Sequence, residues 1–565
     1  MMHSIQWQQA LCSYQPGKGL LATPSWQNST LSVRLDNISG HAMSLDTWSL
    51  FEGQVASADT PIYGEGFQML AQTAGSWGAP EAVGRCPDAA VYRITQDDGF
   101  HTVHNLLLYK AGEEWQLLAF TGCERFGGEF RLYPDGRLQI LLRTEGLSLP
   151  AGGHWQSEPL LVLRGADRQA LLDDLAQHLE RHHPASLPAT SPTGWCSWYH
   201  YYAEVTAADI GENLALMESS FPELEYVQID DGYQAFMGDW LSASARFTGG
   251  LLPLLEQILA AGREPALWVA PFIAETASAL FQSHPEWFVK DESGHPLAAE
   301  RVTYGGWRCT PWYMLDGTHP QVQAHLRQLF TTLRHELGIR YFKLDANFWG
   351  AVHGGRFHDP AASRIQAYRR GMQAILDGVG EDSYLLGCNA PIWPSLGLVQ
   401  GMRLADDIER TGHRIRQTAR ELFYRSWQAG KLWLLDPDCL CLRDLPGQQA
   451  SAAEYRFHLA ALLASGGVLL LGDRLSLLDE AQRALLAPLL QRARSHHQPA
   501  RFTDDAFGHA ISQEGGKTLH FYFNWHNSEL ILDAVPAGCD FFSAEPIPAG
   551  KRVLAPYDAL VLVSA

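Results

Sequence analysis

Eight short apolar runs recur between residues 194 and 473, and helical stretches lie between most of them. Amphipathic segments such as GGLLPLLEQILAAG and HPQVQAHLRQLFTTLRHELG have the helical period. Eight β-then-α units over about 290 residues favour a closed (β/α)8 TIM barrel over an open α/β sheet. Only the gap between the fifth and sixth runs is too short for a full helix. The runs are GWCSWY (194–199), YVQID (226–230), ALWVAP (266–271), YFKLD (341–345), YLLGC (384–388), GMRLAD (401–406), LWLLD (432–436) and GGVLLLGD (466–473).

The two ends of the chain have a different pattern. RLQILLRTEGLSL and VYRITQDDGFHTVHNLLLYK alternate as β-strands do, and predict an N-terminal β-sandwich over residues 1–165. Asp167 is the expected N-cap of a helix that leads into a proline-rich link, together residues 166–190. The barrel then takes residues 191–490. LHFYFNW and YDALVLV predict a small C-terminal β-sandwich over residues 491–565.

Composition limits the partners of the chain. The net charge of −20 lacks the basic footprint of a nucleic-acid binder, and it disfavours anionic membrane surfaces. No run of about 18 apolar residues is present, and the N-terminus does not resemble a signal peptide. The nine scattered cysteines include no CxxC pair, so we expect reduced thiols and a cytoplasmic protein.

Aspartates end five of the eight apolar runs. In a barrel the carboxyl ends of the strands meet on one face, where active sites lie. Each aspartate alone could instead be the N-cap of the next helix. Five in the same position favour a shared acidic site. These residues are Asp230 with Asp231, Asp345, Asp406 with Asp407, Asp436 and Asp473.

Lys343 and Asp345 lie two positions apart on one strand, so both side chains point toward the barrel interior. A lysine beside a carboxylate keeps that carboxylate ionised, as a nucleophile requires. The alternative interpretation is a structural salt bridge, although such buried pairs add little net stability.

Two carboxyl groups of different pKa are what retaining glycoside hydrolysis needs. Asp345 fits the charged role. The Asp406–Asp407 pair fits the proton donor, because adjacent like charges raise one pKa. Neither an HExxH spacing nor a glycine-rich phosphate loop accompanies the aspartates, so we expect no metal and no cofactor. Trp195 and Trp268, among 18 tryptophans, could stack on a sugar or simply fill the core.

Together these segments resemble glycoside hydrolase family 36, the α-galactosidase family that shares a clan with family 27. The resemblance covers residues 190–475 and is closest to the shorter bacterial and archaeal members. The motifs that carry it are, in order, GWCSWYHYY, YVQIDDGYQ, ALWVAPF, YFKLDAN, CNAPIWPSLGLVQGMRLADD and WLLDPDCL.

The resemblance implies roles for individual residues. Asp345 in K-x-D matches the family nucleophile, and Asp407 in R-x-x-x-D matches the acid/base. Asp230 and Asp231 match the pair that holds galactose O4 and O6. Other residues match further sugar contacts: Lys343, Trp268, Cys388 and Arg403.

Asn389 departs from the pattern, because the short members usually have glycine there. This position bears on the 2-substituent of the sugar, so galactose and N-acetylgalactosamine both stay open. The stretch YGEGFQML (63–70) is either a surface hairpin or a segment that reaches over the barrel mouth.

The expected protein is therefore a cytoplasmic, metal-independent, retaining exo-α-galactosidase that acts on small oligosaccharides such as raffinose or melibiose. The alternatives are an α-N-acetylgalactosaminidase, a galactosyl transferase that uses the same intermediate, and a sugar-binding protein without catalysis. The expected partner is a small carbohydrate, and the resemblance is compatible with a homo-oligomer.

Overall fold

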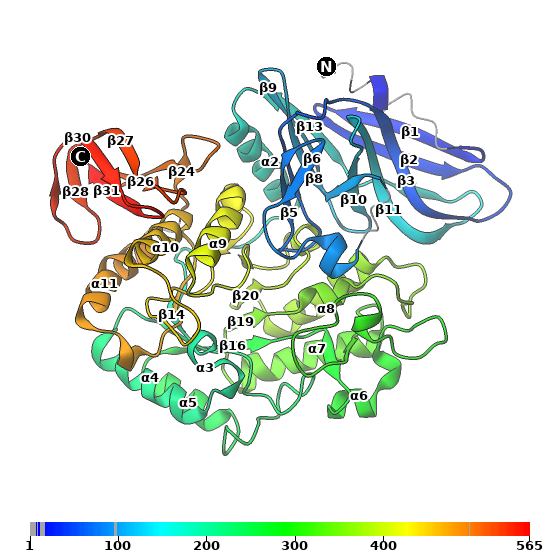
Figure 1. Ribbon diagram of the computed structural model, residues 1–565. Helices are drawn as coiled ribbons and strands as arrows, with labels where there is room; N and C mark the ends of the chain where they lie inside the picture. Colours follow the sequence, from blue (N-terminus) through cyan, green and yellow to red (C-terminus); the bar gives the residue numbers. More distant parts are fainter. Residues whose placement is uncertain (1–6, 8, 12–16, 95–98, 496–497, 565) are drawn as a thin grey trace.

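The computed structural model describes residues 7, 9–11, 17–94, 99–495 and 498–564. Within these ranges the N-terminal strands form two antiparallel sheets, drawn in blue and cyan in Figure 1. The larger sheet contains β1 (Leu20–Gln27), β2 (Thr30–Asn37), β4 (Ile62–Glu65), β5 (Gln72–Ser76), β6 (Ala79–Ala82), β8 (Leu106–Ala111), β9 (Glu114–Phe120), β12 (His154–Gln156) and β13 (Leu160–Gly165). The smaller contains β3 (Met43–Gln54), β7 (His101–His104), β10 (Gly127–Leu132) and β11 (Arg137–Leu149).

A shared apolar core holds these two sheets together. Leu118 and Phe120 of the larger sheet belong to the same buried cluster as Phe130 and Ile140 of the smaller. Because strand side chains alternate between faces, the alternating sequence gives each sheet one apolar face, and the two faces pack together. The predicted strand RLQILLRTEGLSL is β11. The predicted strand pattern VYRITQDDGFHTVHNLLLYK is wrong at its start, because Asp88–Tyr92 is a helical turn (η1). Its residues 95–98 lie outside the described ranges.

Helix α2 (Arg168–His182) connects the sheets to the barrel. Asp167 is its N-cap, as predicted, and its carboxylate accepts hydrogen bonds from the backbone N–H groups of Gln169 and Ala170. Its leucine stripe is buried.

Eight parallel strands follow, all inside the unbroken described range 99–495, and each of the eight predicted runs overlaps one of them. The (β/α)8 barrel is therefore confirmed. The sheet is nearly closed, because the Val468 N–H donates to the Leu435 carbonyl (2.9 Å) between the last two strands. The strands are β14 (Thr193–Cys196), β15 (Tyr226–Ile229), β16 (Glu264–Val269), β19 (Tyr341–Leu344), β20 (Tyr384–Gly387), β21 (Gly401–Arg403), β22 (Leu434–Asp436) and β23 (Leu469–Leu471).

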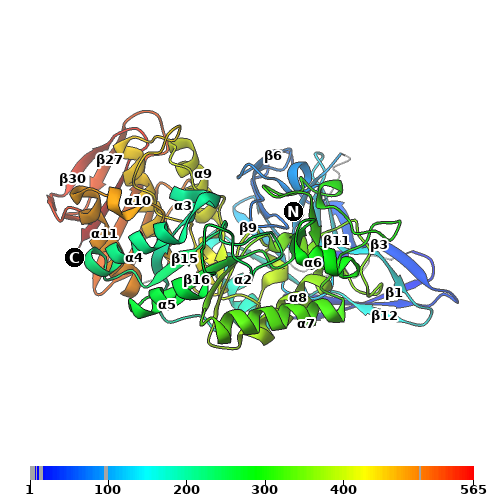
Figure 2. The same ribbon diagram turned by 90° about the horizontal axis from the view of Figure 1, so that it is seen from below.

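Helices surround the barrel, and Figure 2 shows α4, α5 and α7 on the side turned toward the viewer. The two amphipathic segments named from the sequence are α5 and α7. Between β20 and β21 the chain makes only a 3-10 turn, η7 (Trp393–Ser395), so the predicted missing helix is confirmed. The helices are α3 (Trp198–Tyr201), α4 (Ala207–Ser220), α5 (Leu252–Ala260), α6 (Ala279–Ser283), α7 (Pro320–Thr331), α8 (Arg364–Val379), α9 (Gly412–Arg425), α10 (Ala452–Ser465) and α11 (Glu480–Ser495).

The C-terminal strands, drawn in red in Figure 1, lie beside α10 on the opposite side of the molecule from β1–β3. The predicted runs LHFYFNW and YDALVLV contain β26 and β31, which pair with each other. Among the described residues, one sheet contains β24 (Arg501–Phe502), β25 (His509–Glu514), β26 (Lys517–Phe523), β28 (Gly538–Asp540), β29 (Pro546–Ile547) and β31 (Ala559–Ser564), and a second contains β27 (Leu530–Val535) and β30 (Gly550–Leu554).

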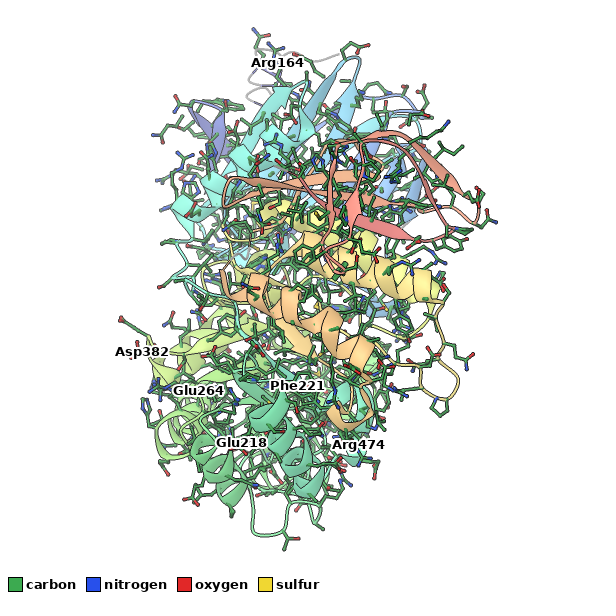
Figure 3. All side chains as sticks on the ribbon, turned by 90° about the vertical axis from the view of Figure 1, so that its left-hand side faces the viewer. Arg164, Glu218, Phe221, Glu264, Asp382 and Arg474 are labelled. Atoms are coloured by element: carbon green, nitrogen blue, oxygen red, sulfur yellow. The ribbon has the colours of Figure 1, made fainter. Side chains whose placement is uncertain are left out.

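Figure 3 shows the length of the molecule from the side. Arg164 of β13 lies near the top, and Glu218, Phe221 and Arg474 lie in the lower half, where the Arg474 guanidinium pairs with Glu212 of α4 (2.6 Å). None of the helices in the described ranges is long and apolar enough to cross a membrane. The order of the β and α/β parts agrees with the sequence, while the residue boundaries between them stay a prediction.

Candidate active site

A cavity of about 430 Å³ opens at the carboxyl ends of the barrel strands. Its walls come from strand ends, from a loop between β17 (Ile273–Glu275) and β18 (Trp312–Met314), and from the N-terminal sheets. The lining residues are Met69, Leu70, Arg85, Cys86, Val91, Trp198, Asp230, Asp231, Trp268, Tyr304, Trp307, Lys343, Asp345, Cys388, Asn389, Asp406 and Asp407. The cavity thus collects most of the residues predicted as a site from five different strands.

Asp345 follows β19 directly and has both carboxylate oxygens engaged. The indole Nε1 of Trp268 donates to Oδ2 (2.9 Å), and the Ala346 N–H donates to Oδ1 (2.6 Å). Ala346 has a φ of 52°, a left-handed conformation that is costly for a residue other than glycine. The two hydrogen bonds hold the Asp345 side chain in one orientation.

The lysine next to Asp345 forms its ion pair elsewhere. Lys343 Nζ lies 2.9 Å from Asp230 Oδ2 on β15, so the predicted Lys343–Asp345 pair is wrong. Burial raises the pKa of Asp345, and the Lys343 charge and the two hydrogen bonds lower it by less, so the net pKa is raised. Lys343 thus favours the ionised form of Asp345, as predicted, but burial outweighs its effect.

Asp230 and Asp231 are both buried, and the carboxylate of each accepts hydrogen bonds from protein groups. Asp230 also accepts from Gln228 Nε2 (2.7 Å). Asp231 accepts from Gln234 Nε2 (2.6 Å) and forms a two-point ion pair with Arg308, whose Nε lies 2.6 Å from Oδ2. Arg308 lies in the loop before β18, and the sequence prediction missed it.

Asp407 is the most exposed of the cavity carboxylates, with 54% of its side chain accessible. Arg403 Nη2 donates to its Oδ1 (2.8 Å). Burial raises the pKa of Asp407, but the positive charges of Arg403, Lys343 and Arg85 outweigh it and hold the pKa below its usual value. The prediction that the charge of Asp406 raises the pKa of Asp407 is therefore wrong. Nearby positive charges, among them Arg403 and Arg85, outweigh that neighbour.

Asp406 also lines the cavity, but its side chain is only 7% exposed and forms ion pairs with two arginines. Arg85 Nε lies 2.6 Å and Arg414 Nη1 lies 3.0 Å from Asp406 Oδ2. Its other oxygen accepts from the N–H of Asp407 (2.8 Å). Of the two adjacent aspartates, Asp407 is thus the one available to a ligand.

Asp438 is a further acid near the cavity, in the segment after β22. Its Oδ2 lies 2.9 Å from the same Arg403 Nη2 that contacts Asp407, and it accepts from the Ile408 N–H (2.8 Å) and the Tyr199 hydroxyl. Burial raises the pKa of Asp438 to about 6, with the negative charge of Asp407 adding to the rise. Arg403 is therefore shared by two acids.

The remaining predicted residues divide into two groups. Trp268, Cys388 and Asn389 line the cavity, and the Tyr92 hydroxyl donates to Asn389 Oδ1 (2.6 Å). Trp195 does not line it: the side chain has no exposed area, and its Nε1 donates to the Asp473 carbonyl (2.9 Å). Trp198, the first residue of α3, lines the cavity instead. In the described part of the chain, no group of three or more His, Cys, Asp or Glu side chains could hold a metal ion.

The Melibiase family matches residues 216–378. The probable α-galactosidase C of Aspergillus flavus is 28% identical over 197 residues, which cover 32% of this chain and 24% of that protein. The α-galactosidase of Escherichia coli is 29% identical over 150 residues, covering 25% of this chain and 20% of that one. The resemblance to glycoside hydrolase family 36 is confirmed.

Solved structures of family 36 proteins share the fold. TtGalA, an α-galactosidase from Thermus thermophilus in complex with p-nitrophenyl α-D-galactopyranoside, superposes with a TM-score of 0.65 at 22% identity, covering 88% of this chain and 98% of that one. The GH36 α-galactosidase AgaA from Geobacillus stearothermophilus gives 0.67 at 13% identity, with 97% and 81% covered. The matched segment spans only about a quarter of the length of the first curated relatives.

The family 36 motifs did not predict the contribution of the N-terminal sheets. Met69 and Leu70 line the cavity, and the Met69 N–H donates to the Ala390 carbonyl (2.9 Å) beyond β20. The segment 63–70 therefore reaches the barrel mouth. The sequence prediction also missed Tyr304 and Trp307, which line the cavity. They lie in the segment TYGGWRC, far in sequence from the carboxyl end of the preceding barrel strand, β16.

Proposed function

We propose that this protein is a retaining exo-α-galactosidase, which removes terminal α-galactosyl units from oligosaccharides such as raffinose or melibiose. One observation carries the proposal: the carboxylates of Asp345 and Asp407 line the same cavity, and the negative charge of Asp407 raises the pKa of Asp345. Glycoside hydrolysis uses two such carboxyl groups beside the sugar, and the resemblance to family 36 favours the retaining form.

Asp345 would attack the anomeric carbon. Its two oxygens are fixed by the Trp268 indole and the Ala346 N–H, so the attacking group is held in place before the sugar arrives. The bond from C1 to the glycosidic oxygen breaks as the bond from C1 to the Asp345 oxygen forms. The product is a covalent glycosyl-enzyme with inverted configuration at C1.

Asp407 would donate its proton to the departing glycosidic oxygen. Its low pKa in the open cavity is unfavourable for a donor, but its side chain is half exposed. A sugar ring that displaces water from Asp407 disfavours the charged form and raises the pKa. The same carboxylate then takes a proton from water, which attacks C1 and releases the sugar with its original configuration.

The acids on β15 would select the sugar. Asp230 and Asp231 are buried, and with Lys343 and Arg308 they form a corner of alternating charge beside the cavity. Hydroxyls at O4 and O6 of galactose would exchange hydrogen bonds with this corner. Glucose, the C4 epimer, directs O4 away from this corner and loses the hydrogen bonds made there, which discriminates between the two sugars.

An α-N-acetylgalactosaminidase is the second candidate. A protein from Flavonifractor plautii that is 32% identical over 127 residues, 22% of this chain, is named A type blood alpha-D-galactosamine galactosaminidase, after a sugar with an amino group at C2 rather than an acetamido group. Asn389, at the position predicted to face the 2-substituent, lines the cavity beside Tyr304. Rates on p-nitrophenyl α-galactoside and its 2-acetamido analogue, measured at equal concentration, decide between the two.

The proposal is tested by Asp345→Ala. We expect loss of turnover on p-nitrophenyl α-galactoside by about 1,000-fold or more, because removing the nucleophile leaves only binding and electrostatic effects. Added azide should restore activity by attacking C1 in place of the carboxylate, giving a galactosyl azide of opposite anomeric configuration. Asp382→Ala, an exposed aspartate before β20, is the control and should keep full activity. Near-normal turnover of Asp345→Ala contradicts the assignment.

A further inference from the structure

An arginine of the N-terminal sheets contacts the turn that carries the proposed proton donor. Arg85 follows β6, lines the cavity and places Nε 2.6 Å from Asp406 Oδ2 and Nη1 3.3 Å from Glu409 Oε1. Asp406 in turn accepts from the N–H of Asp407 (2.8 Å). A chain of two contacts therefore connects Arg85 to the backbone of Asp407.

The segment around Arg85 is held firmly against α9. A Cβ on Gly84 would lie 2.5 Å from Glu421 Oε1 and 2.9 Å from the Leu70 carbonyl, so only glycine permits this close approach. The Gln72 amide donates to the Glu421 carbonyl (3.1 Å). Arg85 thus extends from a fixed point, although half of its own side chain is exposed.

The same helix supports the turn from behind. Glu421 Oε2 accepts from the Asp406 N–H (2.7 Å), so each of the two adjacent aspartates has its backbone N–H bonded to a carboxylate. A buried ion pair between Glu65 of β4 and Arg425 of α9 (2.6 Å) joins the N-terminal sheets to this helix. The turn therefore depends on contacts from both parts of the chain.

We propose that Arg85 is a positioning residue for Asp407: by holding Asp406 from outside the barrel, it fixes the orientation of the proton donor and adds a positive charge beside it. The proposal rests on the proposed function for its kinetic meaning. It makes the N-terminal sheets part of the catalytic apparatus, since without Arg85 the Asp406 carboxylate retains only Arg414 as a cation.

Charged groups from every neighbouring element act on Asp407, and Arg85 is one of several. Arg85 nevertheless differs from the others, because it alone among the cations comes from outside the barrel and is exposed enough to replace without disturbing the core. Its charge lowers the pKa of Asp407 together with those of Arg403 and Lys343. The charged or titratable neighbours are Arg403, Asp406 and Glu409 on or after β21, Lys343 and Asp345 at β19, Cys388 after β20, Asp438 after β22, Arg414 and Glu421 on α9, and Tyr199 on α3.

The first test is the pH profile of kcat on p-nitrophenyl α-galactoside, which follows the pKa of Asp407 with the sugar bound, for Arg85→Gln, Arg85→Lys and Arg93→Gln. A proton donor must be protonated, so the alkaline limb follows its pKa. We expect Arg85→Gln to move that limb up by about half a pH unit or more and to lower kcat roughly tenfold. Arg85→Lys should keep the limb in place. Arg93→Gln removes the same charge from an exposed site of the same segment and should change neither quantity.

A second measurement does not depend on activity. The unfolding midpoint of Arg85→Gln should lie below that of the wild type in low salt, and the difference should shrink in about 1 M NaCl, because salt screens an ion pair that solvent reaches. A limb that stays in place in Arg85→Gln, or moves equally in Arg93→Gln, overturns the proposal, as does a difference in midpoint that is independent of salt concentration. A wild type inactive on α-galactosides refutes the proposed function instead, and the unfolding data then decide the role of Arg85 alone.

Discussion

Asp438→Asn perturbs the shared arginine with the least change in shape. Asp438 and Asp407 contact the same nitrogen of Arg403, at 2.9 Å and 2.8 Å. The asparagine keeps an oxygen that can accept from the Ile408 N–H, but it removes one negative charge. Arg403 is then neutralised by Asp407 alone.

The size of the expected change in the pKa of Asp407 follows from the distance between the two carboxylates. Because both carboxylates touch one nitrogen, they lie within about 6 Å of each other, and at an effective dielectric constant of about 20 their repulsion is roughly 3 kcal/mol, or about two pKa units. Solvent reaches the half-exposed Asp407 and reduces this to about one unit. Removing Asp438 therefore lowers the pKa of Asp407, and the alkaline limb of kcat, which reports that pKa with the sugar bound, moves down by about one pH unit. This sign is opposite to that expected for Arg85→Gln.

The assay is the pH profile of kcat on p-nitrophenyl α-galactoside between pH 4 and 9, with urea unfolding as a check on folding. Asp444→Asn, an exposed aspartate of the same connecting segment, is the matched control and should leave the limb in place. A limb that does not move in Asp438→Asn, or that moves to higher pH, would show that Arg403 does not couple the two acids.

Two further predictions concern stability. Arg425→Met leaves Glu65 buried without its cation, so we expect a loss of about 3–5 kcal/mol in the free energy of urea unfolding, while Arg420→Met on the exposed face of the same helix costs little. Burial raises the pKa of Glu421 to about 7. The folded protein therefore becomes less stable as the pH rises, because Glu421 loses its proton more easily in the unfolded chain. Relative to Glu421→Gln, the wild type should therefore lose about 3 kcal/mol of stability between pH 4.5 and pH 8. Equal pH dependence of the two proteins contradicts this.

Much of the architecture could be predicted because its signals are local. Each barrel strand is an apolar run of a few residues, and helices such as α5 and α7 show their period within a dozen residues. Short runs alternating with helices have few ways to pack, so the barrel followed from their number and order. Asp345 and Asp407 could also be found from local sequence, since each follows the end of a barrel strand.

The partners of these acids could not be predicted in the same way. Lys343 pairs with Asp230 because closing the barrel brings β15 near β19 across its interior, while the sequence shows only that Lys343 is two residues from Asp345. Arg308 and Arg85 come from loops, which carry no periodic pattern and whose path is set by packing.

The sequence by itself determined the fold class, the acidic end of the barrel and the two acids proposed for catalysis, since strand and helix periods and strand-end positions are properties of neighbouring residues. Only the tertiary structure decided the direction of each pKa, which cations hold which carboxylate, and that the N-terminal sheets supply one wall of the cavity. Electrostatic energies depend on distances between groups that are up to hundreds of residues apart in the chain, and folding alone sets those distances.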